Sequence, residues 1–168
     1  GRNDFGLGDS GKMFIILGRD AKMSGSYCLD GTTTCLGGAQ AMTGSIELNG
    51  PSGALQAADL GDTNGDGQDD FVVSAPSQGS KGTFYVVQGQ STWLSSNAPA
   101  TIDLTSDANT TAVEALTYNN TGAKVSSGDF NGDGNQDFLA TSSSNGIAVF
   151  LNNGAGGFAE SFTISTGP

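Results

Sequence analysis

The chain is organised around the stretch Asp129-Phe130-Asn131-Gly132-Asp133-Gly134-Asn135-Gln136-Asp137. An earlier stretch, Asp62-Thr63-Asn64-Gly65-Asp66-Gly67-Gln68-Asp69-Asp70, has the same form, D-x-N-x-D-G-x-x-D. Several carboxyl and amide groups folded into nine residues repel one another unless a cation holds them together. For a single copy, an Asp/Asn/Gly-rich surface turn is the plain alternative, but two matched copies favour a cation site.

The spacing suits Ca²⁺, because oxygens at positions one, three, five and nine and a backbone carbonyl at position seven can converge on one ion. Glycine at position six permits the sharp bend. An EF-hand loop needs Glu at position twelve, where this chain has Val73 and Ala140. The residues that follow each loop are apolar, aromatic or β-branched, which predicts a strand after each loop and not a helix.

Composition favours one all-β domain. The chain has 168 residues, 27 of them glycine and only four proline, and short apolar runs alternate with Ser/Thr/Asn/Gly clusters. A chain of this length can bury a sizeable core. Short apolar runs separated by turn-forming residues are typical of many strands joined by turns. We find no convincing amphipathic helix in the sequence.

The charge is strongly acidic, with a formal net charge of −11 and only six basic residues. Nucleic acids and anionic membranes require Lys/Arg patches, so neither is an expected partner. Seven of the seventeen acidic residues lie in the two loops, where a cation would neutralise them. Histidine is absent, which excludes His-based hydrolytic triads, and we expect no enzymatic activity.

Cys28 and Cys35 are the two cysteines, and a disulfide closing a small loop is expected, with two free thiols as the alternative. A disulfide implies an oxidising, extracellular or cell-surface location. No signal peptide or membrane-length apolar run is visible, so no membrane insertion is expected and a secreted chain would be in mature or trimmed form. Asn109 and Asn119 begin N-glycosylation sequons, which matter only in a eukaryotic secretory route.

The pattern around the loops repeats. The loops begin 67 residues apart, and each has an expected strand before it and two after it. First strands are predicted at 54–61 and 123–128, second strands at 71–74 and 138–141, and third strands at 83–87 and 147–151. Fourth strands, alternating polar and apolar residues, are predicted at 45–48, 101–104 and 161–164.

The amino-terminal segment fits the same scheme but starts in the middle of a repeat unit. Residues 4–7 match the end of a loop with its second strand, and residues 13–18 match a third strand. The predicted units are a partial repeat at 1–50, a complete repeat at 51–106 and a second complete repeat at 107–168. Two segments interrupt the period, at 19–43 and 107–120, and are expected as surface insertions.

This pattern resembles the FG-GAP repeat, the blade unit of integrin α-subunit propellers and of many bacterial surface proteins, including those with the related VCBS repeat. The resemblance is carried by Ala58 to Gly67, Asp70 to Pro76 and Gly82 to Val87, and by Gly128 to Gly134 in the last unit. Ser74 replaces the usual glycine of the Gly-Ala-Pro motif, and Ala140-Thr141-Ser142 stands in its place in the last unit. These departures favour the looser bacterial type over the integrin branch.

The resemblance implies four-stranded antiparallel β-propeller-type blades, with one Ca²⁺ between the first and second strands of each complete unit. It assigns two sets of ligands, in which Gln68 and Asn135 contribute backbone carbonyls: Asp62, Asn64, Asp66, Gln68 and Asp70, and Asp129, Asn131, Asp133, Asn135 and Asp137. About two and a half blades are present, fewer than a closed propeller needs. The chain is therefore expected to be a segment of a longer propeller or a subunit covered by a protein partner or further copies of itself.

Three functions compete. The leading one is a non-enzymatic, calcium-stabilised extracellular module for adhesion or surface architecture. The second is a self-assembling structural subunit of an extracellular filament or surface layer. The third is a carbohydrate-binding propeller domain, in which Trp93 would stack on a glycan, although packing of this ring at a blade edge is the stronger expectation.

Overall fold

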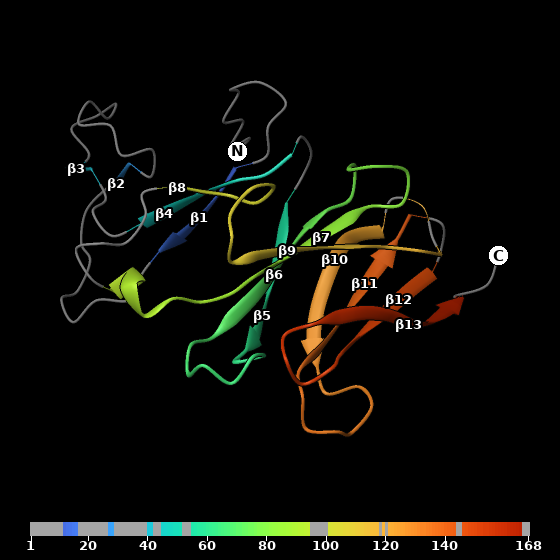
Figure 1. Cartoon of the computed structure of the whole chain (residues 1–168). Coiled ribbons are helices and arrows are strands. Elements are labelled where there is room, and N and C mark those ends of the chain that lie inside the picture. The colour runs from blue at the N-terminus through green and yellow to red at the C-terminus, as the bar shows by residue number, and fades with distance from the viewer. Residues whose placement is uncertain are drawn as a thin grey trace.

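Short strands joined by tight turns form successive β-sheets in this protein, as a computed structural model shows (Figure 1). The structure describes residues 12–16, 27–28, 40–41, 45–51, 55–94, 101–117, 119, 121–143 and 146–165. Within these ranges one short 3₁₀ helix, η1 (Ser91–Leu94), accompanies the strands. The all-β prediction is confirmed, and the described residues form stacked sheets without a closed ring.

The middle sheet has four antiparallel strands in the order β5-β6-β7-β9. Their bounds are Gln56–Gly61, Asp70–Ala75, Thr83–Val87 and Thr110–Glu114. The first three agree with the strands predicted on either side of the first loop. Strand β7 is buried along its whole length, as its unbroken run of β-branched and aromatic residues indicates.

The last sheet repeats this plan with the order β10-β11-β12-β13, again antiparallel throughout. Its strands are Thr121–Gly128, Asp137–Ser142, Gly146–Asn152 and Phe158–Ser165. All four predicted strands of the last unit are confirmed.

The first sheet contains β1 (Lys12–Ile16), β4 (Ser45–Asn49) and β8 (Thr101–Asp103), and a small parallel pair joins β2 (Tyr27–Cys28) to β3 (Gln40–Ala41). Strands β1 and β4 are antiparallel, as expected for the third and fourth strands of the partial unit.

The strand predicted at residues 101–104 does form, at Thr101–Asp103, but its predicted place as the fourth strand of the middle sheet was wrong. Strand β8 does not close the middle sheet but runs parallel to β4 at the edge of the first sheet. The fourth strand of the middle sheet is β9, which lies inside the segment that we expected to be a surface insertion. Both stretches alternate polar and apolar residues, so local pattern alone cannot show which sheet each one joins.

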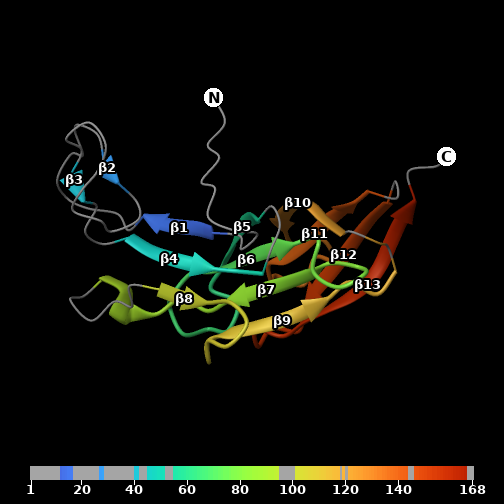
Figure 2. The ribbon, with the colours of Figure 1, turned by 90° about the horizontal axis from the view of Figure 1, so that it is seen from above.

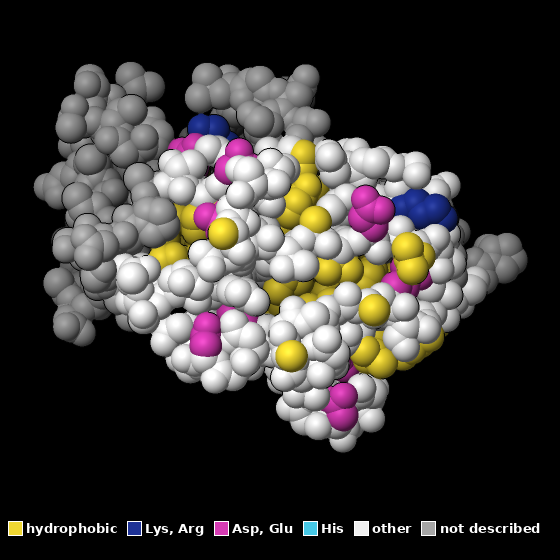
Figure 3. Space-filling model, viewed as in Figure 1, with side chains coloured by type: hydrophobic (Ala, Val, Ile, Leu, Met, Phe, Trp, Pro, Cys, Tyr) yellow, Lys and Arg dark blue, Asp and Glu magenta, His cyan; other side chains and the backbone are white. Residues whose placement is uncertain are grey.

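Two hydrophobic cores hold the three sheets together, and Figure 2 shows the sheets following one another along the molecule. The core between the middle and last sheets contains Phe84, Phe138 and Phe150, whose ring centroids lie 4.5 to 5.2 Å apart. Hydrophobic side chains are visible in the seam between β9 and β13 (Figure 3). The core between the first and middle sheets contains Ile46, Leu48, Tyr85, Val87 and Trp93, among others.

Tyr85 provides a test of this second core. Its ring is buried, and burial raises the pKa of its hydroxyl above the ordinary value of 10.0, with the carboxylates of Asp103 and Glu114 adding to the shift. A raised pKa means that the folded state disfavours the phenolate. The resulting stabilisation is complete below the unfolded pKa and is lost as pH rises through the folded pKa.

We therefore expect a Tyr85→Phe variant to lose less stability than the wild type between about pH 9 and pH 11, which spans the ordinary tyrosine pKa. Urea unfolding at a series of alkaline pH values measures the difference, and phenolate absorbance locates the titration. Identical pH slopes for the two proteins would contradict this account of the Tyr85 environment.

Candidate metal centres

The two acidic loops occupy matching places in the fold. The first connects β5 to β6 and the second connects β10 to β11, and both project from the same edge of the stacked sheets (Figure 1). Each is thus the connection between the first two strands of a four-stranded sheet. This confirms that the loops lie between strands and excludes a helix after either one.

The first carboxylate of each loop gathers backbone N–H groups around itself. One oxygen of Asp62 accepts hydrogen bonds from the N–H groups of Gly65 (2.7 Å) and Asp66 (3.0 Å), and the other accepts from Gly67 (2.8 Å). The two glycines have φ angles of 80° and 84°, which side-chain-bearing residues rarely adopt. The second loop repeats this arrangement with Asp129 as acceptor and with Gly132, Asp133 and Gly134 as donors.

Positions three and five form a second layer. Asn64 accepts from the N–H of Asp66 at 2.9 Å, and the Asp66 carboxylate accepts from the N–H of Gln68 at 2.9 Å. The Asn64 amide also donates to Asp66, at 3.1 Å. Equivalent bonds connect the matching residues of the second loop, Asn131, Asp133 and Asn135. Two separate sequences have therefore adopted one loop structure.

These hydrogen bonds favour ionised carboxylates. The N–H of Gly67 is the largest cause that holds the pKa of Asp62 below its ordinary value of 3.8. The N–H of Asn135, followed by the amide of Asn131, lowers the pKa of Asp133 in the same way. Both groups are exposed to solvent, so the lowered pKa values of these two carboxylates have no large effect on folding.

Position nine behaves differently, because Asp70 is fully buried at the start of β6. One of its oxygens accepts hydrogen bonds from the N–H (3.0 Å) and the hydroxyl of Thr63, and the other accepts from the N–H of Gly89 at 2.8 Å. Thr63 opens the loop, and Gly89 follows β7. The carboxylate therefore joins the loop to the end of the third strand.

Asp137 has the same role in the last sheet. It is fully buried, and it accepts from the N–H of Phe130 in the loop and from the N–H of Asn152 at the end of β12, both at 2.9 Å. Sequence reasoning assigned Asp70 and Asp137 as ligands but missed these four donor residues. The available signal was that position nine is also the first residue of a buried strand.

The donor set matches a hard cation in chemistry. An ionised carboxylate offers about four lone-pair sites, so an oxygen that accepts one N–H can still coordinate a cation. This spare capacity is present in one oxygen each of Asp62, Asp70 and Asp129 and in both oxygens of Asp137. Within the described ranges, however, no group of three or more His, Cys, Asp or Glu side chains is placed to hold a metal ion. The calcium assignment for the two ligand sets stays a prediction.

The other candidate residues lie away from the loops. Asn109 precedes β9 and Asn119 lies just before β10, whereas Cys35 and the Cys28 side chain fall outside the described residues. Trp93 is 8% exposed, and its ring lies 6.2 Å from that of Phe71. This ring is part of the core between the first and middle sheets, as the packing alternative predicted.

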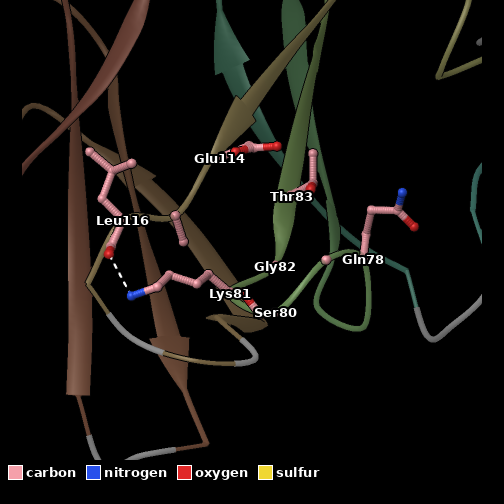
Figure 4. Close-up of a pocket in the computed structure, with 9 residues that line it drawn as sticks. Gln78, Ser80, Lys81, Gly82, Thr83, Glu114 and Leu116 are labelled. Carbon is pink, nitrogen blue, oxygen red and sulfur yellow. Dashed lines mark hydrogen bonds between the residues drawn. The ribbon is translucent and has the colours of Figure 1, made fainter.

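A hollow of about 380 Å³ lies between the turn 78–82 and the end of β9 (Figure 4). The Lys81 ammonium donates there to the carbonyls of Leu116 (2.7 Å) and Thr117 (3.1 Å). This cation holds the chain that leads from the middle sheet to the last sheet. Its donors are directed at the protein's own backbone.

Comparison with protein families identifies the repeats. An FG-GAP repeat model matches residues 54–87, which include the first loop with β5, β6 and β7. An FG-GAP-like repeat model matches residues 129–168, which include the second loop and β11 to β13. The chain therefore contains two segments that match FG-GAP-type repeats.

FG-GAP repeats indicate an integrin-like, β-propeller-type module and are typical of extracellular or surface proteins. Both matches fall on the units that the sequence predicted, and each includes one acidic loop. No curated protein and no solved structure matches the chain. Among the described residues, no helix is long and apolar enough to cross a membrane.

Proposed function

We propose that this protein is a non-enzymatic, calcium-stabilised extracellular module that serves adhesion or surface architecture. The observation that supports it best is the pair of loops with one hydrogen-bond pattern, each inside a matched FG-GAP repeat. In each loop, carboxylate and amide oxygens at positions one, three and five are presented on an exposed edge of the sheets. These are the oxygen ligands that Ca²⁺ prefers.

Calcium would have a structural role in these loops. Binding to the folded loops would neutralise carboxylates that lie close together, and it would thereby stabilise the native state. The ion would hold the hairpin closed at the edge where each blade's first strand ends. This role is structural, and it leaves the remaining surfaces free to contact a partner.

Calcium is expected to raise the melting temperature. A ligand present at 100 times its dissociation constant stabilises by about 2.7 kcal/mol per site, which corresponds to roughly 5–10 °C for a chain of this size. Thermal unfolding in chelator and in excess calcium measures the shift, and titration calorimetry counts the sites. Equal melting temperatures in the two conditions would remove the metal from the proposal.

The double variant Asp66→Asn and Asp133→Asn tests the assignment to the loops. Each change keeps the shape and an oxygen acceptor but removes one negative charge at position five. We expect the calcium-dependent shift to fall by more than half while the melting temperature in chelator changes little. Asp69→Asn is the matched control, because Asp69 is exposed in the same loop but is not a predicted ligand.

Self-assembly remains the alternative function, and a specific surface favours it. Among the described residues, no sheet packs on the second face of the last sheet, although this sheet follows the same plan as the middle sheet. The glycan-binding alternative has lost the residue that suggested it, since Trp93 is buried in a core.

A further inference from the structure

The turn at residues 153–157, which connects β12 to β13, lies between the two acidic loops (Figure 1). A Cβ built on Gly156 would lie 3.3 Å from the Cβ of Asn64, in the first loop. A Cβ built on Gly154 would lie 3.4 Å from the side-chain oxygen of Asn135, in the second loop. The backbone of one turn in the last sheet therefore contacts both loops, although the first loop belongs to the middle sheet.

Hydrogen bonds hold this turn in one shape. The side-chain oxygen of Asn153 accepts from the N–H groups of Ala155 (2.9 Å) and Gly157 (3.0 Å), and the N–H of Asn153 donates to the carbonyl of Gly157 at 2.9 Å. Gly154 and Gly156 have φ angles of 77° and 74°, which glycine adopts readily. A displacement at one end of such a closed turn is transmitted to its other end.

A continuous series of contacts joins the buried carboxylates at position nine of the two loops. The N–H of Asn152 donates to Asp137, and the side-chain oxygen of Asn152 accepts from an N–H of the turn at 3.0 Å. At the other side of the turn, a Cβ built on Gly156 would lie 3.6 Å from the hydroxyl oxygen of Thr63, which donates to Asp70. Asn152 and Thr63 are both buried, so the surrounding protein also fixes their positions.

The two loops also approach each other directly. A Cβ built on Gly61, at the end of β5, would lie 3.9 Å from the Cγ of Gln136 in the second loop. This is an ordinary van der Waals distance. The base of the first loop therefore lies against the second loop, in addition to the contact through the turn.

Electrostatics opposes a favourable coupling between the loops. A cation in one loop lowers the negative potential at the other loop, and this weakens the binding of a second cation. Salt screens this effect, because the Debye length falls to about 3 Å at 1 M ionic strength. Van der Waals contacts through the turn are not screened in this way. Ionic strength therefore separates the two contributions.

We propose that the turn 153–157 positions the first acidic loop and couples it to the second, so that calcium bound to either loop raises the calcium affinity of the other. A cation that orders the second loop would hold Asp137, Asn152 and the turn in one arrangement. The first loop then has less conformational freedom to lose when it binds its own cation. Thermodynamic linkage makes the effect reciprocal. The inference rests on the proposed calcium function.

An amide NMR titration with calcium, at about 1 M salt, tests the coupling. The N–H groups of Gly67 and Gly134 donate to the first carboxylate of their respective loops, so their signals report the two loops separately. Asp133→Asn weakens calcium binding at the second loop. We expect this variant also to raise the dissociation constant of the first loop, by about fivefold or more, which is the usual size of coupling between sites.

Asn153→Ala removes the acceptor that closes the turn but changes no predicted ligand. On this background, adding Asp133→Asn should change the dissociation constant of the first loop by less than about twofold, because the loops are no longer coupled. Ala159→Ser is the matched control, since Ala159 is exposed on β13 outside the turn. On the control background, the effect of Asp133→Asn on the first loop should remain about fivefold.

Hydrogen exchange in chelator gives a readout that needs no calcium. Asn153→Ala should speed exchange at the Gly65 and Gly67 amides of the first loop, whereas Ala159→Ser should not. Equal exchange rates in these two variants would overturn the positioning role of the turn. If both loops titrate with calcium but independently, the coupling is wrong and the proposed function stands. If neither loop responds to calcium, both proposals fail.

Discussion

Replacing Asp70 by alanine in metal-free protein should lower the free energy of unfolding by about 3–5 kcal/mol, which is the loss expected when several buried donors lose one charged acceptor. The Asp70 side chain is fully buried and accepts hydrogen bonds from three donors on Thr63 and Gly89. The substitution leaves these donors inside the protein without an acceptor. Urea unfolding in the presence of chelator measures the effect, and Asp137→Ala should behave in the same way.

The chelator is essential to this experiment, because it separates two roles that the motif combines. If position nine acts only as a calcium ligand, its loss is harmless when no calcium is present. If it joins the loop to the third strand, the loss persists. Asp69→Ala is the control: its carboxylate is exposed one residue earlier, and we expect a change within about 0.5 kcal/mol. An Asp70→Ala variant as stable as this control in chelator would contradict the structural role.

Asp70→Asn gives an intermediate test. The amide keeps the shape and one oxygen, but its NH₂ group faces an N–H or hydroxyl donor where the carboxylate had an acceptor. We expect a loss of about 1–3 kcal/mol, which is typical of one buried donor left unpaired. We expect the loss of unfolding free energy for Asp70→Asn to lie between the losses for Asp69→Ala and Asp70→Ala. This result would show that the stability depends on the hydrogen-bond acceptor at position 70 and not on the volume of the side chain.

The loops and most of the strands could be predicted because their signals are local. The nine-residue motif marks a hairpin, and the apolar runs that follow it, such as Thr83–Val87, are too short and too β-branched for helices. The partner of an outer strand is a non-local property. Strands β8 and β9 have similar alternation within fourteen residues of each other, and only packing against different sheets decides their places.

The distant donors to the carboxylate at position nine could not be predicted, for a related reason. The motif shows an acidic residue at a ligand spacing, but the donors from Gly89 and Asn152 come from 15 to 19 residues away. Their position depends on how the third strand returns along the second. Close contacts between sheets are also non-local, so no local sequence pattern predicts them, although glycine alone permits them.

Gly82 marks the closest of these contacts. It follows the turn before β7 with a φ of 94°, and a Cβ at this position would lie 2.2 Å from the carbonyl oxygen of Thr121 at the start of β10. Its own carbonyl accepts from the N–H of Ala115, and the neighbouring carbonyl of Lys81 accepts from Thr121. The backbone here therefore joins the middle sheet to the last sheet.

Gly82→Ala should consequently destabilise the protein by about 3 kcal/mol or more, because the φ angle is strained for alanine and the backbone of β10 must also move. Gly79→Ala is the matched control in the same turn: its φ is 67°, but a Cβ there meets nothing within 4 Å. The control should lose only the conformational cost, about 1–2 kcal/mol. The difference between the two variants isolates the contact between sheets.

The fluorescence of the single tryptophan reports which sheets lose stability in the Gly82→Ala variant. Trp93 belongs to the core between the first and middle sheets, whereas Gly82 contacts the last sheet. In Gly82→Ala, unfolding followed by far-ultraviolet circular dichroism should therefore begin at a lower urea concentration than unfolding followed by Trp93 fluorescence. In Gly79→Ala the two transitions should coincide, as expected for one cooperative unit. A Gly82→Ala protein that loses no more stability than the control would show that β10 can shift to accept the extra carbon, and that the close approach of the two sheets is not what holds them in register.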